Sequence, residues 1–152
     1  MKNLPDILKK EKYNKIKFKV SKTQHLLIKA TINGVKGNFI LDTGASSSCI
    51  DFENIKLFEI KATKSKTKAS SAGATGMHTQ IAKGNTVKIG LWKINNFEII
   101  IIDLSHVNQA LKRHKTKLIH GIIGADILQY GKGIIDYYNH CLCLKNESNP
   151  TE

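Results

Sequence analysis

The sequence is short of arginine, of cysteine and of long apolar runs, and each shortage excludes a class of protein. Its longest clear apolar run, Ile99 to Ile102, is far shorter than the roughly 20 residues of a membrane-spanning helix, so we expect no membrane partner. The first 22 residues alternate lysine with polar residues, which argues against a secretory signal. Three cysteines, of which Cys141 and Cys143 are only two residues apart, do not suit a disulfide framework. We therefore expect a cytoplasmic protein.

The charge is strongly unbalanced, with 24 Lys+Arg against 12 Asp+Glu and a net charge of +12. Such a surface binds nucleic acid non-specifically with ease. However, Arg113 is the only arginine, and the bidentate recognition of phosphate and guanine favours arginine over lysine. We expect no specific nucleic-acid partner, and a basic nucleic-acid-binding β domain stays as an alternative.

The length of 152 residues predicts one domain with a core of its own. Hydrophobic residues at 41% and charged residues at 24% are typical of a globular protein. We divide the chain into a basic N-terminal segment at 1–22, a folded domain at 23–145 and a flexible tail at 146–152.

Short strands dominate the hydrophobic pattern, which predicts an all-β fold. The dipeptide Asn33-Gly34 between two apolar runs is a strong hairpin signal. We predict strands near 16–20, 25–32, 35–41, 79–82, 86–89, 97–102, 134–135 and 141–144. We also predict a helical turn near 52–56, a helix capped by Ser105 that ends near 112, a short helix over 125–130, and an exposed Lys/Thr/Ser-rich stretch at 61–68.

One motif joins a carboxylate to the end of an apolar strand. Phe39-Ile40-Leu41 leads directly into Asp42-Thr43-Gly44-Ala45, where glycine permits a tight turn. About 80 residues later, Ile122-Ile123-Gly124 precedes the short helix. Small residues at 70–76 lie between the two motifs and suit the tip of a mobile hairpin.

In order and spacing, these motifs resemble the retropepsin-like family of aspartic peptidases, and the closing pattern at 133–144 resembles its bacterial members. The resemblance covers about residues 22–144 and implies a closed β-barrel (the acid protease fold) with a short C-terminal helix, working as a homodimer. It implies that Asp42 is catalytic. It further implies active-site support from Thr43, Gly44, Ala45, Ile122, Ile123 and Gly124, and a substrate-covering flap at Ala72, Gly73, Ala74, Thr75 and Gly76.

The chemistry of this family requires two carboxylates that share one proton and hold a water between them. This chain contains a single Asp-Thr-Gly, so the second carboxylate must come from Asp42 of another copy. The predicted function is an aspartic endopeptidase that acts on a peptide or protein substrate without a cofactor or metal. Retroviral members carry acidic residues where Ser46 and Ser47 stand and an arginine at the position of Ala125, and these positions form an ion pair in them; this chain lacks both partners of that pair.

Several alternatives accompany this prediction. The Asp-Thr-Gly triplet could be an ordinary β-turn, and the fold could be a catalytically silent module for dimerisation or peptide binding. We expect Asp103 to end a strand and Asp126 to lie in the first turn of a helix, not to be further catalytic carboxylates. Cys141 and Cys143 lack a second ligand pair at zinc-site spacing, so we expect buried apolar cysteines. Cys49 lacks an evident histidine and acid partner, and the run Ser46-Ser47-Ser48 lacks the Gly-x-Ser-x-Gly pattern of a nucleophile.

Overall fold

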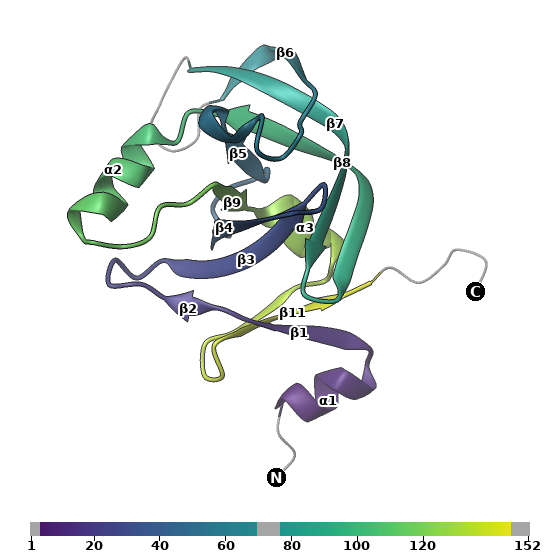
Figure 1. Ribbon diagram of the computed structural model, residues 1–152. Coiled ribbons are helices and arrows are strands. Elements are labelled where there is room, and N and C mark those ends of the chain that lie inside the picture. Colours follow the sequence, from purple (N-terminus) through teal and green to yellow (C-terminus); the bar gives the residue numbers. More distant parts are fainter. Residues whose placement is uncertain (1–3, 70–76, 147–152) are drawn as a thin grey trace.

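The computed structural model describes residues 4–69 and 77–146, with 64–69 and 77–78 described by their backbone alone (Figure 1). The strands are β1 (Tyr13–Lys17), β2 (Lys19–Val20), β3 (Leu26–Ile32), β4 (Val35–Leu41), β5 (Cys49–Asp51), β6 (Ala62–Ala69), β7 (Met77–Ile89), β8 (Trp92–Ile102), β9 (Gly121–Ile123), β10 (Ile134–Asp136) and β11 (Cys141–Lys145). The helices are α1 (Leu4–Lys10), α2 (Ser105–Arg113) and α3 (Ala125–Tyr130), with a 3-10 turn η1 (Phe52–Asn54). No helix of the described residues has the length and apolar character needed to cross a membrane.

Six strands close into a barrel in the order β3-β4-β9-β5-β8-β7, because β3 pairs with both β4 and β7. Strands β2 and β6 extend this sheet at its two ends. Strand β9 lies parallel to β4 and antiparallel to β5, so it is inserted between two strands that follow each other in the chain. A closed barrel with a short helix near the C-terminus confirms the predicted all-β fold.

The β3–β4 hairpin follows directly from its turn residues. Asn33 and Gly34 have φ of 51° and 86°, the positive values that a two-residue hairpin turn demands. Ile32 and Val35 pair across this turn, and the register continues to Leu26 opposite Leu41. The hairpin signal in the sequence is therefore confirmed, and it sets the register that delivers Asp42 to the end of β4.

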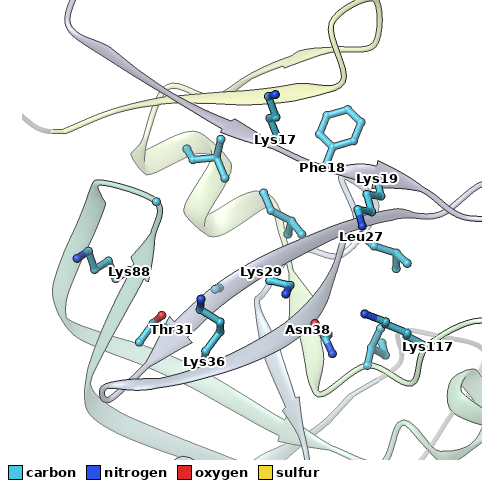
Figure 2. Close-up of a pocket in the computed structure, with 15 residues that line it drawn as sticks. Lys17, Phe18, Lys19, Leu27, Lys29, Thr31, Lys36, Asn38, Lys88 and Lys117 are labelled. Carbon is cyan, nitrogen blue, oxygen red and sulfur yellow. The ribbon is translucent and has the colours of Figure 1, made fainter.

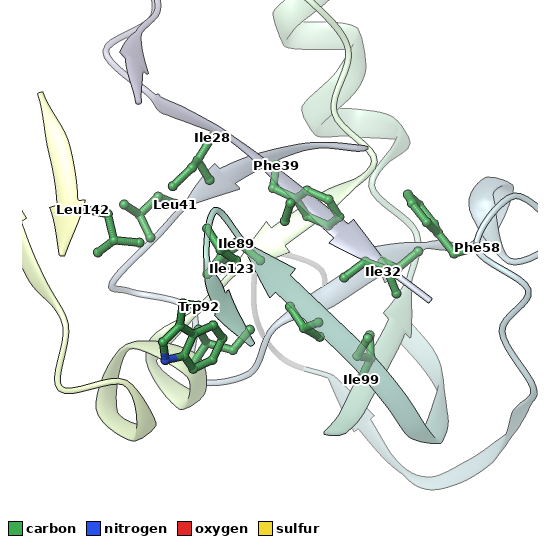
Figure 3. Close-up of a cluster of buried hydrophobic side chains, with 14 of the residues drawn as sticks. Ile28, Ile32, Phe39, Leu41, Phe58, Ile89, Trp92, Ile99, Ile123 and Leu142 are labelled. Carbon is green, nitrogen blue, oxygen red and sulfur yellow. The ribbon is translucent and has the colours of Figure 1, made fainter. Parts of the chain in front are cut away.

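The main core fills the barrel with large apolar side chains (Figure 3). Phe39 from β4, Ile99 from β8 and Ile123 from β9 are almost completely buried there. Trp92 is fully buried, and its indole Nε1 donates a hydrogen bond to the backbone oxygen of Lys145 at 3.1 Å. This bond satisfies the polar atom of the side chain, so the tryptophan packs without a desolvation penalty.

A smaller sheet, β1-β11-β10, lies beside the barrel and includes part of the basic N-terminal segment (Figure 1). Its register runs from Tyr13 opposite Lys145 to Lys17 opposite Cys141. Helix α1, which the sequence analysis did not predict, covers this region because Leu8 packs against Cys141 and Cys143. The local signal was weak: one acidic residue in the first turn and two lysines in the last, as the helix dipole favours.

Two predicted strands are one strand in the structure. The ranges 79–82 and 86–89 both belong to β7, which runs through the residues between them. Its register with β8 shifts between Ala82 and Asn85, next to Gly84 at φ 76°. This irregularity interrupts the alternation of apolar and polar residues along the strand, and so the residues between 82 and 86 resembled a turn in the sequence.

Three other details differ from the predictions. Leu104, not Ser105, is the N-cap of α2, and the side chain of Leu104 makes no capping hydrogen bond. The stretch at 61–68 belongs largely to β6, whose pairing with β7 the polar composition did not reveal. The predicted strand at 16–20 is divided at Phe18 into β1 and β2. The backbone N–H of Phe18 donates to the backbone oxygen of His140 at 3.0 Å and does not take part in the pairing of either strand.

Candidate active site

Asp42 is held at the end of β4 by its neighbour β9. Leu41 lies opposite Ile123 in the parallel pair, and the Asp42 backbone N–H donates to the Ile123 oxygen at 2.9 Å. The aspartate is half-buried, so its backbone is fixed by β9 while part of the residue remains accessible to solvent. A carboxylate at such a position can meet a substrate or a second protein chain.

The turn that follows Asp42 closes on the aspartate itself. The Ala45 N–H donates to the backbone oxygen of Asp42 at 3.2 Å, and the Gly44 N–H donates to its carboxylate Oδ1 at 2.8 Å. A Cβ at Gly44 would lie 3.2 Å from that carboxylate oxygen, so a side chain there would crowd it. Thr43 and Gly44 are exposed at the tip of the turn.

The second motif packs directly beneath this turn, as its order in the sequence predicts. The Ala125 N–H donates to the Ala45 oxygen at 2.7 Å. A Cβ at Gly124 would stand 2.6 Å from the same oxygen and 3.0 Å from the Ser47 carbonyl carbon, which only glycine avoids. The structure therefore brings both motifs together in one chain.

The two isoleucines of the second motif face opposite sides of β9. Ile123 packs into the main core, while Ile122 belongs to a second apolar cluster with Ile40 and with Leu111 of α2. Each side chain therefore locks β9 to a different part of the molecule. Because β9 carries the acceptor for Asp42, this packing also positions the aspartate.

Sequence analysis missed a pair of residues behind the turn, Ser48 and Asp126. Ser48 is buried, and its N–H donates to both carboxylate oxygens of Asp126, at 3.0 and 2.9 Å. Its hydroxyl donates to the same carboxylate at 2.7 Å and accepts the Gly124 N–H at 2.9 Å. Asp126 does lie in the first turn of α3, as predicted, but its main role is to tie that helix to the start of β5. The sequence signal that could have indicated this pair was an acidic residue two positions after Gly124.

Cys49 and Cys143 have thiols that are difficult to ionise. Burial raises the pKa of the Cys49 thiol to about 12 and that of Cys143 to about 11, so both remain protonated at neutral pH. Cys141 and Cys143 are buried under α1, as expected for apolar cysteines. Within the described part of the chain, no group of three or more His, Cys, Asp or Glu side chains is arranged to hold a metal ion.

Asp103 has a purely local environment. Its carboxylate accepts the Ser105 N–H at 2.8 Å, and hydrogen bonds from the Ser105 backbone and side chain lower the pKa of Asp103. It directly follows the end of β8, as predicted. This exposed aspartate belongs to the start of α2 and not to the Asp42 turn.

The predicted flap residues Ala72, Gly73, Ala74, Thr75 and Gly76 lie outside the described residues. The strands on either side of them, β6 and β7, form an antiparallel pair that ends with Ala69 opposite Met77. The predicted hairpin tip therefore connects two strands that are paired as a hairpin requires.

Comparison with known proteins agrees with this geometry. The family model described as "Aspartyl protease" matches residues 28–127, which include both motifs. A retropepsin-like aspartic protease from Rickettsia conorii has a similar structure, with a TM-score of 0.59 and 21% identity over 88% of this chain and 92% of that chain. The retroviral protease-like domain of Ddi1 from Leishmania major is also similar, with a TM-score of 0.56 and 19% identity over 81% of this chain and 90% of that chain. No curated protein matches the sequence. The chain belongs to the aspartyl protease family and has the retropepsin-like fold.

Proposed function

We propose that the protein is an aspartic endopeptidase whose active site forms when the Asp42 carboxylates of two copies meet in a homodimer. The observation that carries this proposal is the setting of Asp42, which is held by β9 through its backbone and lies half-buried at the start of a turn with an exposed tip. Each chain has one Asp-Thr-Gly, so one copy supplies half of a two-carboxylate site.

In the proposed reaction the two carboxylates share one proton and hold a water molecule. The ionised Asp42 takes a proton from the water, whose oxygen attacks the scissile carbonyl carbon. The protonated Asp42 of the other copy donates its proton to the carbonyl oxygen, which gives a tetrahedral diol. The diol then collapses: one of its hydroxyl groups returns a proton to one Asp42, the C–N bond breaks, and the nitrogen takes a proton from the other Asp42 and leaves as an amine, so that the dyad again holds one proton. No covalent intermediate with the enzyme forms.

The other predicted site residues would support this chemistry. Thr43 at the exposed tip would hydrogen-bond across the dimer, and Gly44 would let the two backbones approach. Ala45, Ile122, Ile123 and Gly124 would hold the turn through the contacts described above. The residues from Ala72 to Gly76 would fold over the bound peptide as a flap.

The test compares Asp42→Asn with the matched variant Asp103→Asn, which removes an exposed carboxylate outside the site. With a diverse peptide library as substrate, Asp42→Asn should lower turnover by about a thousandfold or more, since both carboxylates of the dyad disappear together. Asp103→Asn should keep activity close to that of the wild type. Specific activity of the wild type should fall on dilution as dimers separate.

Three results would count against the proposal. Turnover by Asp42→Asn within about tenfold of the wild type would place the chemistry elsewhere. An active monomer in sedimentation experiments would refute the shared site. A stable dimer without peptidase activity on any peptide would favour the catalytically silent module.

We also propose a cytoplasmic location for the protein. Its cysteines, Cys49, Cys141 and Cys143, are all free and buried, as in proteins of a reducing compartment.

A further inference from the structure

A groove on the outer face of β3 and β4 is lined by six lysines and has a volume of about 650 Å³ (Figure 2). We call it the lysine groove and define it by Lys17, Lys19, Lys29, Lys36, Lys88 and Lys117. Asp42 is not among the residues that line it. The groove is therefore a feature separate from the candidate active site.

The closure of the barrel creates this concentration of charge. Along β3, Ile28, Ala30 and Ile32 are buried, so Lys29 and Thr31 between them lie on the outer face. Thr31 is opposite Lys36 of β4 and also opposite Lys88 of β7. Residues that pair directly across strands share one face, and so lysines from three strands lie on the same surface.

The positive charge of the groove is not neutralised within the chain. No aspartate or glutamate lines the groove. Within residues 4–69 and 77–146, none of the six lysines forms an ion pair with a carboxylate. Like charges that share one face repel each other, and an anionic partner would relieve that repulsion.

Apart from Thr31 and Asn38, the side chains that line the groove between the lysines are apolar. Leu27 and Ile16 are half-buried beside them, and Ile119 and Phe18 close the groove from the flanking segments. A groove with an apolar floor and a cationic rim matches a ligand that carries both carboxylates and apolar side chains. Its volume lies within the roughly 300–1,000 Å³ typical of ligand pockets.

The composition of the groove favours a peptide over a nucleic acid. The only arginine of the chain, Arg113, does not line the groove, although arginine is the preferred residue for phosphate and guanine. Phe18, the single aromatic side chain in the lining, is only 4% exposed and offers no face on which a base could stack. The floor is instead suited to aliphatic side chains.

We propose that the lysine groove binds an acidic segment of a protein partner, with aspartate or glutamate side chains on the lysines and intervening apolar side chains on the floor. Charge complementarity sets the choice of partner, and the apolar contacts supply affinity once water is excluded.

The experiment uses the full chain and a fluorescent synthetic peptide that alternates glutamate with leucine and isoleucine. Its binding is followed by fluorescence anisotropy, and mass spectrometry verifies that the peptide stays intact. A second peptide with glutamine at each glutamate position isolates the effect of charge. The wild type should bind the glutamate peptide about tenfold or more tightly than the glutamine peptide, and binding should weaken as salt rises.

Two triple variants with equal changes of net charge locate the binding surface. Lys29→Glu, Lys36→Glu and Lys88→Glu together should weaken binding by about tenfold or more. The matched control combines Lys56→Glu, Lys61→Glu and Lys83→Glu, all exposed and outside the groove, and should change the affinity by less than about threefold. A milder groove variant with glutamine at the same three positions guards against misfolding, and circular dichroism monitors the fold of each protein.

Several outcomes would overturn the proposal. Equal weakening by both triple variants would show that net charge alone drives binding. Tighter binding of single-stranded DNA or RNA, lost with the groove variant, would assign the surface to nucleic acid. If the glutamate peptide did not bind at millimolar concentration, the proposal that the groove binds an acidic segment would be refuted.

Discussion

Removal of the Asp126 carboxylate should destabilise the protein by about 2–4 kcal/mol, because it leaves two donors of Ser48 without an acceptor. Ser48 is 4% exposed, so water cannot easily replace the lost partner. Each buried donor without a partner costs about 1–3 kcal/mol, and the Ser48 N–H and hydroxyl both lose their acceptor. The sum is roughly 2–6 kcal/mol, and local relaxation reduces it to the lower part of that range.

The assay is urea unfolding followed by circular dichroism at one protein concentration, since dimerisation would make stability depend on concentration. Asp126→Ala should show the full loss. Asp126→Asn keeps one acceptor oxygen and should lose roughly half as much. The matched control is Asp103→Ala, which removes an exposed carboxylate with a local backbone contact and should cost about 1 kcal/mol or less. Thermal midpoints should fall by about 2–4 °C per kcal/mol for a chain of this size.

The reasoning is refuted if Asp126→Ala unfolds at the same urea concentration as Asp103→Ala. That result would mean that the hydrogen bonds between Asp126 and Ser48 contribute nothing net to the fold. It would also remove the argument that this pair positions the turn that carries Asp42.

Two further predictions concern the same region and the buried thiols. Gly124→Ala should destabilise the protein by about 1–3 kcal/mol in urea unfolding, because the new methyl group would clash with the backbone of Ala45 and Ser47. An unchanged free energy of unfolding would contradict this close approach. Iodoacetamide should modify Cys49 and Cys143 slowly in the native protein at pH 8 and rapidly in urea, and equal rates would contradict their burial. Since the folded state raises both pKa values above the ordinary 9.0, their contribution to stability is complete below that pH and is lost as pH rises toward about 11 and about 12.

Features with local causes could be predicted from the sequence. The turn Asn33-Gly34 has positive φ at both residues, as the twist of a two-residue hairpin requires, and asparagine and glycine adopt such values readily. Helix α3 has the predicted bounds, since it begins after Gly124 and ends before Gly131. The proximity of Asp42 to Gly124 was predicted from two motifs that share one family pattern.

Features with distant causes could not be predicted. Ser48 and Asp126 are 78 residues apart, and nothing in their local composition indicates that one carboxylate accepts both donors of the serine. The lysine groove depends on the pairing of β3 with both β4 and β7, which places Lys36 and Lys88 on either side of Thr31. Helix α1 forms over a buried surface that the C-terminal strand provides. In each case a contact across the fold overrides or extends the local pattern.

The hydrogen bonds around the Asp42 turn explain how one chain would position its half of the proposed two-carboxylate site. Asp42 is bound to Ile123, and Ala45 is bound to Ala125, so the turn is fixed to β9 and α3 at both of its ends. Ser48, which directly precedes β5, extends the same attachment to Asp126 in the first turn of α3. Between these points the exposed residues are Thr43 and Gly44 at the tip of the turn and Ser46 and Ser47 after it. A second copy could therefore meet this tip without any rearrangement of the frame that aims the carboxylate.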